Sequence, residues 1–380
     1  MSFPWLKQPK QKWTITHLTG ETKDKLDDSA AKNEFEGIEP TVIPSADAVV
    51  HLDYDPATLR SLGEMEYVKE DGGQWTRFVC ISDTHSKTFD VPLGDVLLHS
   101  GDLSNLGTVR GLTATMEWLY GLPHKVKIII AGNHDLTLHK DYYRDSWSRW
   151  HREPEDYKKI IELMTGERAK KAGIVYLEDT SCTFSVGPGR REWTVYGSPW
   201  SPYFHDWAFN YKSDKAEELV ASYSNADILL THGPPERVFD FTRTKEHVGC
   251  PSLASHLASG RLRPRIHSFG HIHESRGAHI HSWDAKDGAS RPPRAQNRFY
   301  GVKDPKDRFL ELEGEDVEKT RMELEQERVE AEERNSDVSL QRTVLVNAAN
   351  DPMGPGAWVN GRKVKHGGRN FQPIVVDLKD

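Results

Sequence analysis

The sequence predicts an α/β protein, because short apolar runs typical of buried strands alternate with segments of helical periodicity. Five of these runs are largely apolar, and each is followed at once by a polar motif. The five runs cover residues 77–82, 95–100, 127–131, 227–230 and 265–269. Buried strands read in this way, and open α/β sheets place ligands at the carboxyl ends of their strands. We therefore expect the five motifs to meet at one rim.

The other elements follow from local periodicity and composition. Two segments, 113–120 and 155–164, have the apolar spacing of amphipathic helices. The further strands that we expect, separated by turns or longer connections, are 174–176, 183–186, 193–196, 343–347 and 373–378.

Composition changes twice along the chain, which predicts three regions. Residues 1–75 are polar and broken by prolines, so we expect an N-terminal extension. Residues 76–283 and 341–380 carry the strand pattern and form the expected domain. Residues 284–340 are dense in charge and read as an insertion, which either faces solvent or contains a helix that binds a protein partner.

The charge and the cysteines exclude several classes of protein. The net charge of −8 argues against stable nucleic-acid binding, although bound cations would still allow an anionic substrate. The three cysteines form no CxxC pair, so we expect reduced thiols rather than a disulfide framework. We see neither an apolar signal core nor a run long enough to span a bilayer, so a cytoplasmic protein without a membrane partner is expected.

The polar motifs after the five runs contain the ligand types that divalent metals prefer. They are Asp83-Thr84-His85, Gly101-Asp102, Gly132-Asn133-His134-Asp135, Thr231-His232-Gly233 and Gly270-His271-Ile272-His273. Carboxylate oxygens and neutral imidazoles suit a hard or intermediate divalent cation. The third and fifth motifs are the most specific, because such residues rarely follow buried strands without a role.

The spacing within the motifs suggests how two cations would be held. Asp83 and His85 are two residues apart, so on an extended segment they point the same way. Asp102 is suited to bridge two cations, because its two oxygens can each hold one. Asn133 adds a neutral oxygen ligand. The shells are then completed by His232, His271 and His273, while His134 is free to face the substrate.

Other histidines are expected to be supporting or peripheral. His99 and His267 lie inside the apolar runs and are interpreted as core or supporting groups. The histidines that we expect to face solvent are His124, His139, His151 and His256.

The motif series resembles that of the calcineurin-like metallophosphoesterase superfamily, D-x-H, G-D, G-N-H-[DE], H and G-H-x-H. The segments RFVCISDTHS, KIIIAGNHDLT, DILLTHGPP and FGHIHES are similar to the metallophosphoesterase-domain-containing branch, which is related to class III cyclic nucleotide phosphodiesterases. The resemblance covers about residues 76–283 and resumes near residues 343–380. It implies a four-layer fold, in which two mixed β-sheets pack face to face and are flanked by helices.

The resemblance also implies roles for the site residues. The first metal would be held by Asp83, His85, Asp102 and His273, and the second by Asp102, Asn133, His232 and His271. His134 resembles the residue that contacts the phosphate and assists the leaving oxygen. Some members of the branch lack the histidine found here as His271, so its presence favours a complete two-metal site. The D-R-G sequence of protein phosphatases is absent after Asp102, which argues against a protein phosphatase.

The main functional hypothesis is a metal-dependent phosphoric ester hydrolase, acting on cyclic nucleotides or similar small phosphodiesters through a metal-activated hydroxide. The cofactors would be two divalent ions, drawn from manganese, iron, zinc and nickel. The alternatives are a phosphomonoesterase, a dinucleotide polyphosphate hydrolase, and a weakly active regulatory or scaffold protein that retains the metal site. Aromatic residues crowd the segment from Trp200 to Phe209, where they either stack a nucleobase or fill the core.

Overall fold

The computed structural model of the protein describes residues 40–242, 244, 246–283, 341–349, 357–359, 362–364 and 372–380. The predicted insertion at 284–340 and the first part of the predicted N-terminal extension lie outside these residues.

The first sheet has seven strands in the order β1-β2-β17-β3-β4-β5-β6. They are β1 (Thr41–Pro44), β2 (Ala48–Asp53), β3 (Trp75–Ile81), β4 (Val96–His99), β5 (Val126–Ile130), β6 (Ile174–Leu177) and β17 (Ile374–Lys379). Strands β3 to β6 run parallel, and β17 lies antiparallel between β2 and β3. Every residue of β3, β4 and β5 is buried, as their apolar runs predict.

The second sheet has six strands in the order β13-β14-β12-β11-β8-β7. They are β7 (Thr180–Ser185), β8 (Glu192–Ser198), β11 (Ile228–Thr231), β12 (Ile266–Phe269), β13 (Gly277–Trp283) and β14 (Gln341–Asn347). The four inner strands are parallel, and the two edge strands β7 and β13 are antiparallel to their neighbours. The predicted strands of both sheets are confirmed.

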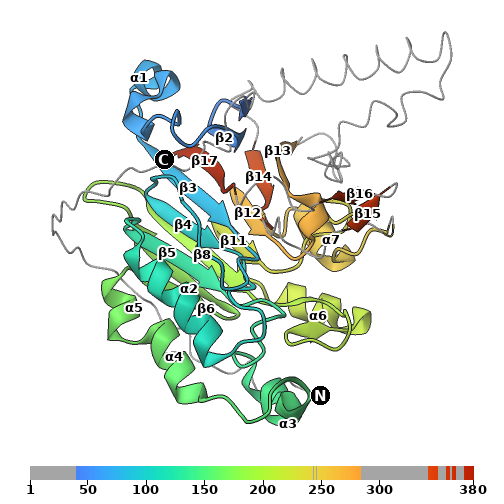
Figure 1. Cartoon of the computed structure of the whole chain (residues 1–380). Helices are drawn as coiled ribbons and strands as arrows, with labels where there is room; N and C mark the ends of the chain where they lie inside the picture. The colour runs from blue at the N-terminus through green and yellow to red at the C-terminus, as the bar shows by residue number, and fades with distance from the viewer. Residues whose placement is uncertain are drawn as a thin grey trace, which may run out of the picture.

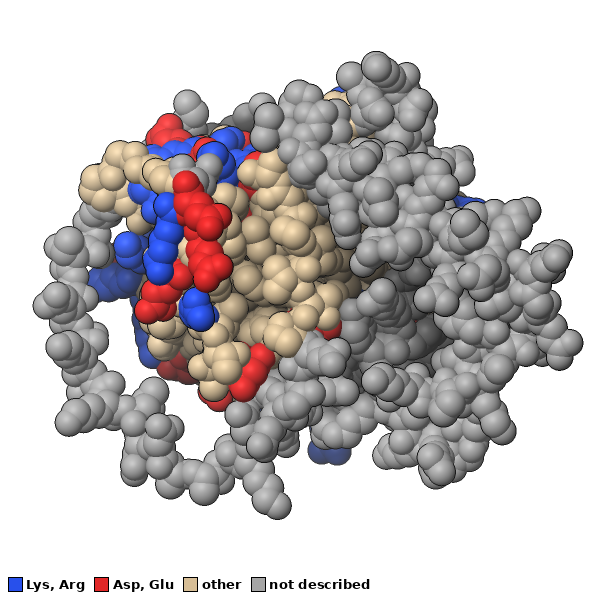
Figure 2. Space-filling view, turned by 90° about the horizontal axis from the view of Figure 1, so that it is seen from above, with Lys and Arg blue, Asp and Glu red and all other residues tan. Residues whose placement is uncertain are grey.

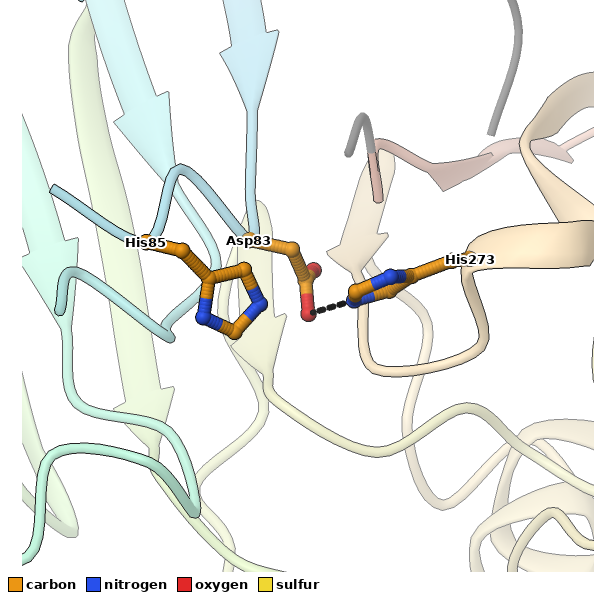
Figure 3. A group of neighbouring side chains, drawn as sticks. All are labelled: Asp83, His85 and His273. Atoms are coloured by element: carbon orange, nitrogen blue, oxygen red, sulfur yellow. Dashed lines mark hydrogen bonds and ion pairs between the residues drawn. The ribbon is translucent and has the colours of Figure 1, made fainter. Parts of the chain in front are cut away.

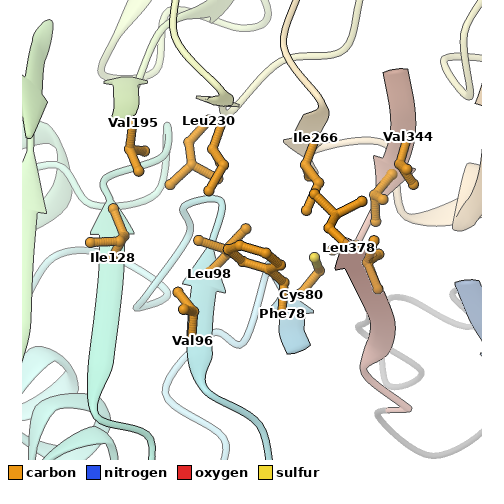
Figure 4. Close-up of a cluster of buried hydrophobic side chains, with 14 of the residues drawn as sticks. Phe78, Cys80, Val96, Leu98, Ile128, Val195, Leu230, Ile266, Val344 and Leu378 are labelled. Carbon is orange, nitrogen blue, oxygen red and sulfur yellow. The ribbon is translucent and has the colours of Figure 1, made fainter. Parts of the chain in front are cut away.

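The main core lies between the two sheets (Figure 4). Phe78 and Leu98 project from the first sheet towards Leu230 and Ile266 of the second, and all four are fully buried. Burial of apolar surface stabilises a fold by about 25 cal/mol per Å², and this burial holds the two sheets face to face.

Helices cover the outer face of each sheet (Figure 1). The first sheet is covered by α2 (Val109–Gly121), α4 (Tyr157–Thr165) and α5 (Glu167–Lys171), and the second by α6 (Ala216–Ala221) and α7 (Pro251–Ala258). Buried Leu112 and Met116 of α2 and Ile160 of α4 pack against the first sheet. The α/β/β/α arrangement confirms the expected four-layer fold, and both predicted helices are present.

The remaining elements are short or peripheral. They are η1 (Leu62–Glu64), α1 (Glu66–Asp71), α3 (Lys140–Trp150), β9 (Ser201–Pro202), β10 (Asn210–Tyr211), η2 (Ser213–Lys215), η3 (His273–Ser275), β15 (Ala357–Val359) and β16 (Arg362–Val364). None of the helices in the described part of the chain combines the length and the apolar character needed to cross a bilayer.

The structure differs from the expected domain boundary at residue 75. Residues 41–53, inside the predicted extension, form β1 and β2, and β2 pairs with β17 in the first sheet. Every residue of β2 except the last is buried. The described end of residues 1–75 is therefore part of the domain, because β2 covers an edge that β17 would otherwise expose.

The two strands next to the predicted insertion are direct neighbours. Trp283, the last residue of β13, pairs with Gln341, the first residue of β14. The two ends of the segment 284–340 thus leave and re-enter the fold at adjacent positions.

The face seen from above carries basic and acidic side chains close together (Figure 2). Among the described residues on that face, blue and red groups are interspersed beside a broad uncharged surface, so neither sign dominates there.

Candidate metal centre

The five motifs follow β3, β4, β5, β11 and β12, and backbone hydrogen bonds join their loops. The amide of Asp83 donates to the carbonyl of Gly101 at 2.9 Å, which ties the loop after β3 to the loop after β4. The amide of Gly270 donates to the carbonyl of His232 at 3.0 Å, which ties the loops after β12 and β11. Two contacts cross between the sheets: His232 Nδ1 lies 2.9 Å from the carbonyl of Ser100, and the amide of His271 donates to Asp83 Oδ2 at 3.0 Å. The strand ends of the two sheets therefore meet at one rim.

Asp83, His85 and His273 form the first group of close ligand atoms (Figure 3). Their three ligand atoms lie within 4.8 Å of one another. His273 Nε2 is 3.1 Å from Asp83 Oδ1, and the side chains point towards a common centre. The amide of His271 donates to Asp83 Oδ2 at 3.0 Å, so the second sheet also fixes this carboxylate of the first.

Asp83, Asp102 and His232 form a second such group, again within 4.8 Å. Asp102 lies between the two groups, because Oδ1 is 3.5 Å from His232 Nε2 and Oδ2 is 3.8 Å from His85 Nε2. Asp83 belongs to both groups as well. The first sheet therefore offers two carboxylates, rather than one, at the junction of the groups.

The surroundings of His232 fix which ring nitrogen faces the centre. Its Nδ1 lies 2.9 Å from the carbonyl of Ser100, which can only accept a hydrogen bond. In the neutral ring, Nε2 then carries a lone pair, and it lies 2.8 Å from Asn133 Oδ1. Two acceptors at this distance need a proton or a cation between them.

His85 gives the second test of whether the residues fit a metal. Its side chain is 5 % exposed, and neither ring nitrogen has a hydrogen-bond partner. Burial lowers the pKa of His85 to about 4, so the ring is neutral at physiological pH. A buried, unpartnered imidazole nitrogen is unfavourable unless it binds something, and a neutral imidazole is a common metal ligand. The residues present therefore fit a divalent cation.

His271 is placed differently from the other expected ligands. Its imidazole belongs to neither group of mutually close ligand atoms, but its ring lies 5.0 Å from the ring of His232. Burial lowers the pKa of His271 to about 3, so this ring is also neutral. The structure brings it to the border of the second group.

His134 lies at the same rim with one ring nitrogen occupied. Its backbone amide donates to Asp102 Oδ1 at 2.8 Å, and its Nδ1 lies 2.7 Å from the carbonyl of Asn105. That carbonyl can only accept, so Nδ1 carries the proton and Nε2 is left for another partner. The ring packs between His85 and Trp207, with centroid distances of 4.8 Å and 4.1 Å.

The charge on the two carboxylates is favoured by their neighbours. Burial alone would raise the pKa of Asp83, but the hydrogen bond from His273 and the nearby imidazoles hold this pKa well below its ordinary value. The pKa of Asp102 is also lowered, because His232 and His134 outweigh the effect of burial. Both side chains are thus ionised, as metal ligands must be.

Asp135 is a supporting residue to which the sequence argument gave no role. Its Oδ2 accepts from the amides of Gly132 and Leu103 at 2.9 and 3.0 Å, and its Oδ1 accepts from the amide and hydroxyl of Ser104. It therefore ties the loop after β5 to the loop after β4. Its position at the end of the third motif, directly after Asn133 and His134, was the sequence signal that could have indicated this supporting role.

His99 and His267 support the rim from inside the strands, as expected. His99 Nε2 lies 3.0 Å from the hydroxyl of Thr84, and His267 Nε2 lies 2.9 Å from the hydroxyl of Thr231. Both rings are fully buried, and burial lowers the pKa of each to about 3.

Four expected ligands adopt a left-handed backbone conformation. The φ angles of Asp83, His85, Asp102 and His271 are 54°, 48°, 52° and 70°. Such a conformation costs non-glycine residues on the order of 1–3 kcal/mol each and is concentrated at functional sites. The sharp turns that it produces aim these side chains across the strand ends.

Two motif glycines allow close approach between the loops. A Cβ atom on Gly132 would lie 2.3 Å from Asp102 Oδ1, and one on Gly270 would lie 2.2 Å from Asp83 Oδ2. Real Cβ contacts are essentially never this short. A larger residue at either position would displace a carboxylate of the centre.

Two of the four histidines that we expected to face solvent are clearly enclosed, which corrects that expectation. His124 is 2 % exposed, and its Nε2 lies 3.1 Å from the carbonyl of Pro92. His139 stacks on Phe209, with ring centroids 4.6 Å apart. Their partners are distant in sequence, so local polarity did not reveal them.

Comparison with known proteins agrees with this geometry. Residues 76–275, about half of the chain, match the family model described as calcineurin-like phosphoesterase. Metallophosphoesterase domain-containing protein 1 of Homo sapiens and of Mus musculus are each 39% identical over 218 residues, covering 53% of this chain and 62% of the relative. A UPF0046 protein of Caenorhabditis elegans is 32% identical over 219 residues, covering 53% of this chain and 52% of the relative. The matched part thus spans about three-fifths of the mammalian relatives.

Proposed function

Because the chain belongs to the calcineurin-like phosphoesterase family, we propose that it is a metal-dependent hydrolase of phosphoric esters, acting on cyclic nucleotides or similar small phosphodiesters. The observation that carries the proposal is the buried convergence of Asp83, Asp102 and His232, next to the unpartnered ring of His85. Buried carboxylates and an unpartnered imidazole are costly unless they bind a further group, which favours a metal-binding role.

The proposed ligand assignment follows the two groups and the resemblance. One cation would be held by Asp83, His85, Asp102 and His273, and the other by Asp102, Asn133, His232 and His271. When bound, two divalent cations would lower the pKa of a coordinated water and neutralise charge on the phosphate oxygens. The ligand types accept manganese, iron, zinc or nickel.

We assign His134 the role of contacting the substrate. The hydrogen bond from its Nδ1 to the carbonyl of Asn105 holds the ring in one orientation and leaves Nε2 for the substrate. From that atom it would stabilise a phosphate oxygen or the leaving oxygen. The amide of His134 also orients Asp102, so the same loop serves both the substrate and the ligands.

The chain's other expected associations also remain proposals. A protein partner is proposed for residues 284–340, which lie outside the described residues. A cytoplasmic location is proposed because Cys80, Cys182 and Cys250 are all unpaired and buried, as in proteins that are kept reduced.

The test compares substrates and variants on the full chain after loading with Mn²⁺. The substrates are bis-p-nitrophenyl phosphate, 2′,3′- and 3′,5′-cyclic nucleotides, p-nitrophenyl phosphate and a dinucleotide polyphosphate. We expect turnover of a diester by the wild-type chain and a loss of at least about 100-fold in Asp102→Ala, because Asp102 borders both groups. Stoichiometric metal without turnover of any ester would overturn the proposal and favour a regulatory protein.

A further inference from the structure

The aromatic segment, residues 200–211, exposes two large side chains beside the metal centre. Tyr203 is 55 % exposed and Phe204 is 53 % exposed. Only two other large apolar side chains in the described residues, Val42 and Leu93, are comparably exposed. The pair is therefore unusual in its context, because no other Phe, Tyr or Trp with a described side chain is exposed.

The aromatic segment contacts the rim at two places. The ring of Trp207 packs on His134 at a centroid distance of 4.1 Å. The ring of Phe204 lies 6.2 Å from the ring of His271, at an interplanar angle of 84°. The aromatic segment therefore borders both His134, the proposed substrate contact, and His271, a proposed ligand of the second metal. Phe204 of this segment is exposed to solvent on one side and faces His271 on the other.

The backbone around Phe204 is held in place by hydrogen bonds. The amide of Phe204 donates to Asn210 Oδ1 at 3.1 Å, and the amide of Tyr203 donates to the carbonyl of Tyr211 at 2.9 Å. Asn210 Nδ2 in turn donates to the hydroxyl of Ser201 at 3.0 Å. These contacts join β9 to β10 at the base of the loop that presents the two rings.

Helix α3 braces the far side of the same loop. Arg149 forms an ion pair with Asp206 at 2.7 Å, and the hydroxyl of Tyr142 donates to the carbonyl of Asp206 at 2.7 Å. His139 Nδ1 accepts from the amide of Phe209 at 3.0 Å. The exposed rings are thus mounted on a backbone that is fixed before any ligand binds, which reduces the entropy lost on binding.

We propose that Phe204, with Tyr203 beside it, is a stacking platform for the base of a nucleotide whose phosphate lies at the metal centre. The proposal rests on the proposed function, and it names the residue that would recognise the base of a nucleotide substrate. A flat apolar face next to a phosphate site is suited to a base, because every base has a π-face that stacks on an aromatic ring. The edge-on contact of Phe204 with His205, at 4.3 Å, orients the ring.

The test measures binding with matched probes by calorimetry on the Mn²⁺-loaded full chain. AMP, GMP and CMP are each compared with ribose 5-phosphate, which carries the same phosphate and sugar but no base. The quantity of interest is the ratio of the two affinities, because any general effect on the phosphate site cancels. We expect at least one nucleotide to bind about 5- to 100-fold more tightly than ribose 5-phosphate.

Two substitutions distinguish the effect of the aromatic face of Phe204 from the effect of an apolar side chain at that position. Phe204→Leu keeps an apolar side chain but removes the aromatic face, and it should reduce the ratio by about 5- to 100-fold. Phe204→Tyr keeps the face and should preserve the ratio. Leu93→Ala is the control, because Leu93 is 68 % exposed and precedes β4, whereas the Gly101-Asp102 motif follows the other end of that strand.

Each outcome decides the proposal. A wild-type ratio near one, or an equal ratio in the wild type and Phe204→Leu, overturns the stacking platform. Turnover of the same panel of esters, which includes bis-p-nitrophenyl phosphate, is measured in parallel and tests the hydrolase separately. Turnover without base preference refutes only the platform, whereas a base preference that depends on Phe204 without any turnover refutes the hydrolase and supports the nucleotide site.

Discussion

Gly270→Ala tests whether the close approach of β12 to β3 positions the metal ligands. The added Cβ would lie 2.2 Å from Asp83 Oδ2 and 2.1 Å from the hydroxyl oxygen of Ser82, whereas Cβ contacts below 3.0 Å are essentially never seen. The carboxylate or the loop must therefore shift by roughly 1 Å, a displacement that can cost about 100-fold in activity when it affects a reacting group.

The carboxylate cannot shift without losing interactions. The amide of His271 donates to Asp83 Oδ2 at 3.0 Å, and His273 Nε2 contacts Oδ1 at 3.1 Å. Hydrogen bonds to charged groups contribute about 1.5–3 kcal/mol each, and overpacking costs about 1–3 kcal/mol. We expect Gly270→Ala to lower the free energy of unfolding by about 2–4 kcal/mol and Mn²⁺ affinity by at least about 10-fold.

Urea unfolding of the metal-free chain measures the first quantity, and calorimetric titration with Mn²⁺ measures the second. Gly121→Ala is the matched control, because a Cβ on Gly121, at the end of α2, meets nothing within 4 Å. It should change the free energy of unfolding by less than about 1 kcal/mol. A Gly270→Ala chain with wild-type stability and wild-type Mn²⁺ binding would refute the reasoning.

Three further predictions concern the support of the site and the sheet. Asp135→Asn replaces an acceptor of buried amides by a donor, so we expect a loss of about 2–4 kcal/mol in urea unfolding; an unchanged midpoint would exclude a structural role. Burial alone would raise the pKa of Asp377, but two hydrogen bonds from Arg77 lower it. The ionised carboxylate therefore stabilises the folded state above about pH 4, and this stabilisation is lost as the pH falls through the lowered pKa. Acid unfolding should accordingly become shallower in Asp377→Asn, and an identical acid transition would contradict this. Chelation of bound metal should lower the melting temperature, and Mn²⁺ should restore it, as linkage requires; a melting temperature insensitive to both would argue against binding.

The rim could be predicted from the sequence because its signals are local. The strands β3, β4 and β5 are buried on both faces, so they read as apolar runs whatever their partners are. Each motif follows its strand directly, so the topology of parallel strands brings the motifs together. The meeting of the candidate ligands at one rim could be anticipated, but the place of Asp83 in both groups depends on the turn at φ 54°, which spacing does not encode.

The features that were missed depend on distant partners. The strand β2 lies in a region that is polar overall, but its own sequence, AVVHLD, is mostly apolar and was a local signal for a strand. Its pairing with β17, more than 300 residues away, is the part that the sequence does not show. His139 belongs to the support of the aromatic segment only because Phe209 packs on it. The local sequence around His139 is compatible with solvent, and tertiary contacts decide otherwise.

The order of the strands has a consequence for synthesis of the protein. Strand β17 lies between β2 and β3, and β14 lies between β12 and β13, so each sheet receives an interior strand from residues that follow the insertion. When residues 76–275 have left the ribosome, all five motifs are present, but β3 and β12 each still have an unpaired edge. The nascent chain therefore carries the complete set of candidate ligands in an incomplete scaffold, and exposed strand edges favour chaperone binding in the interval before β14 and β17 are made.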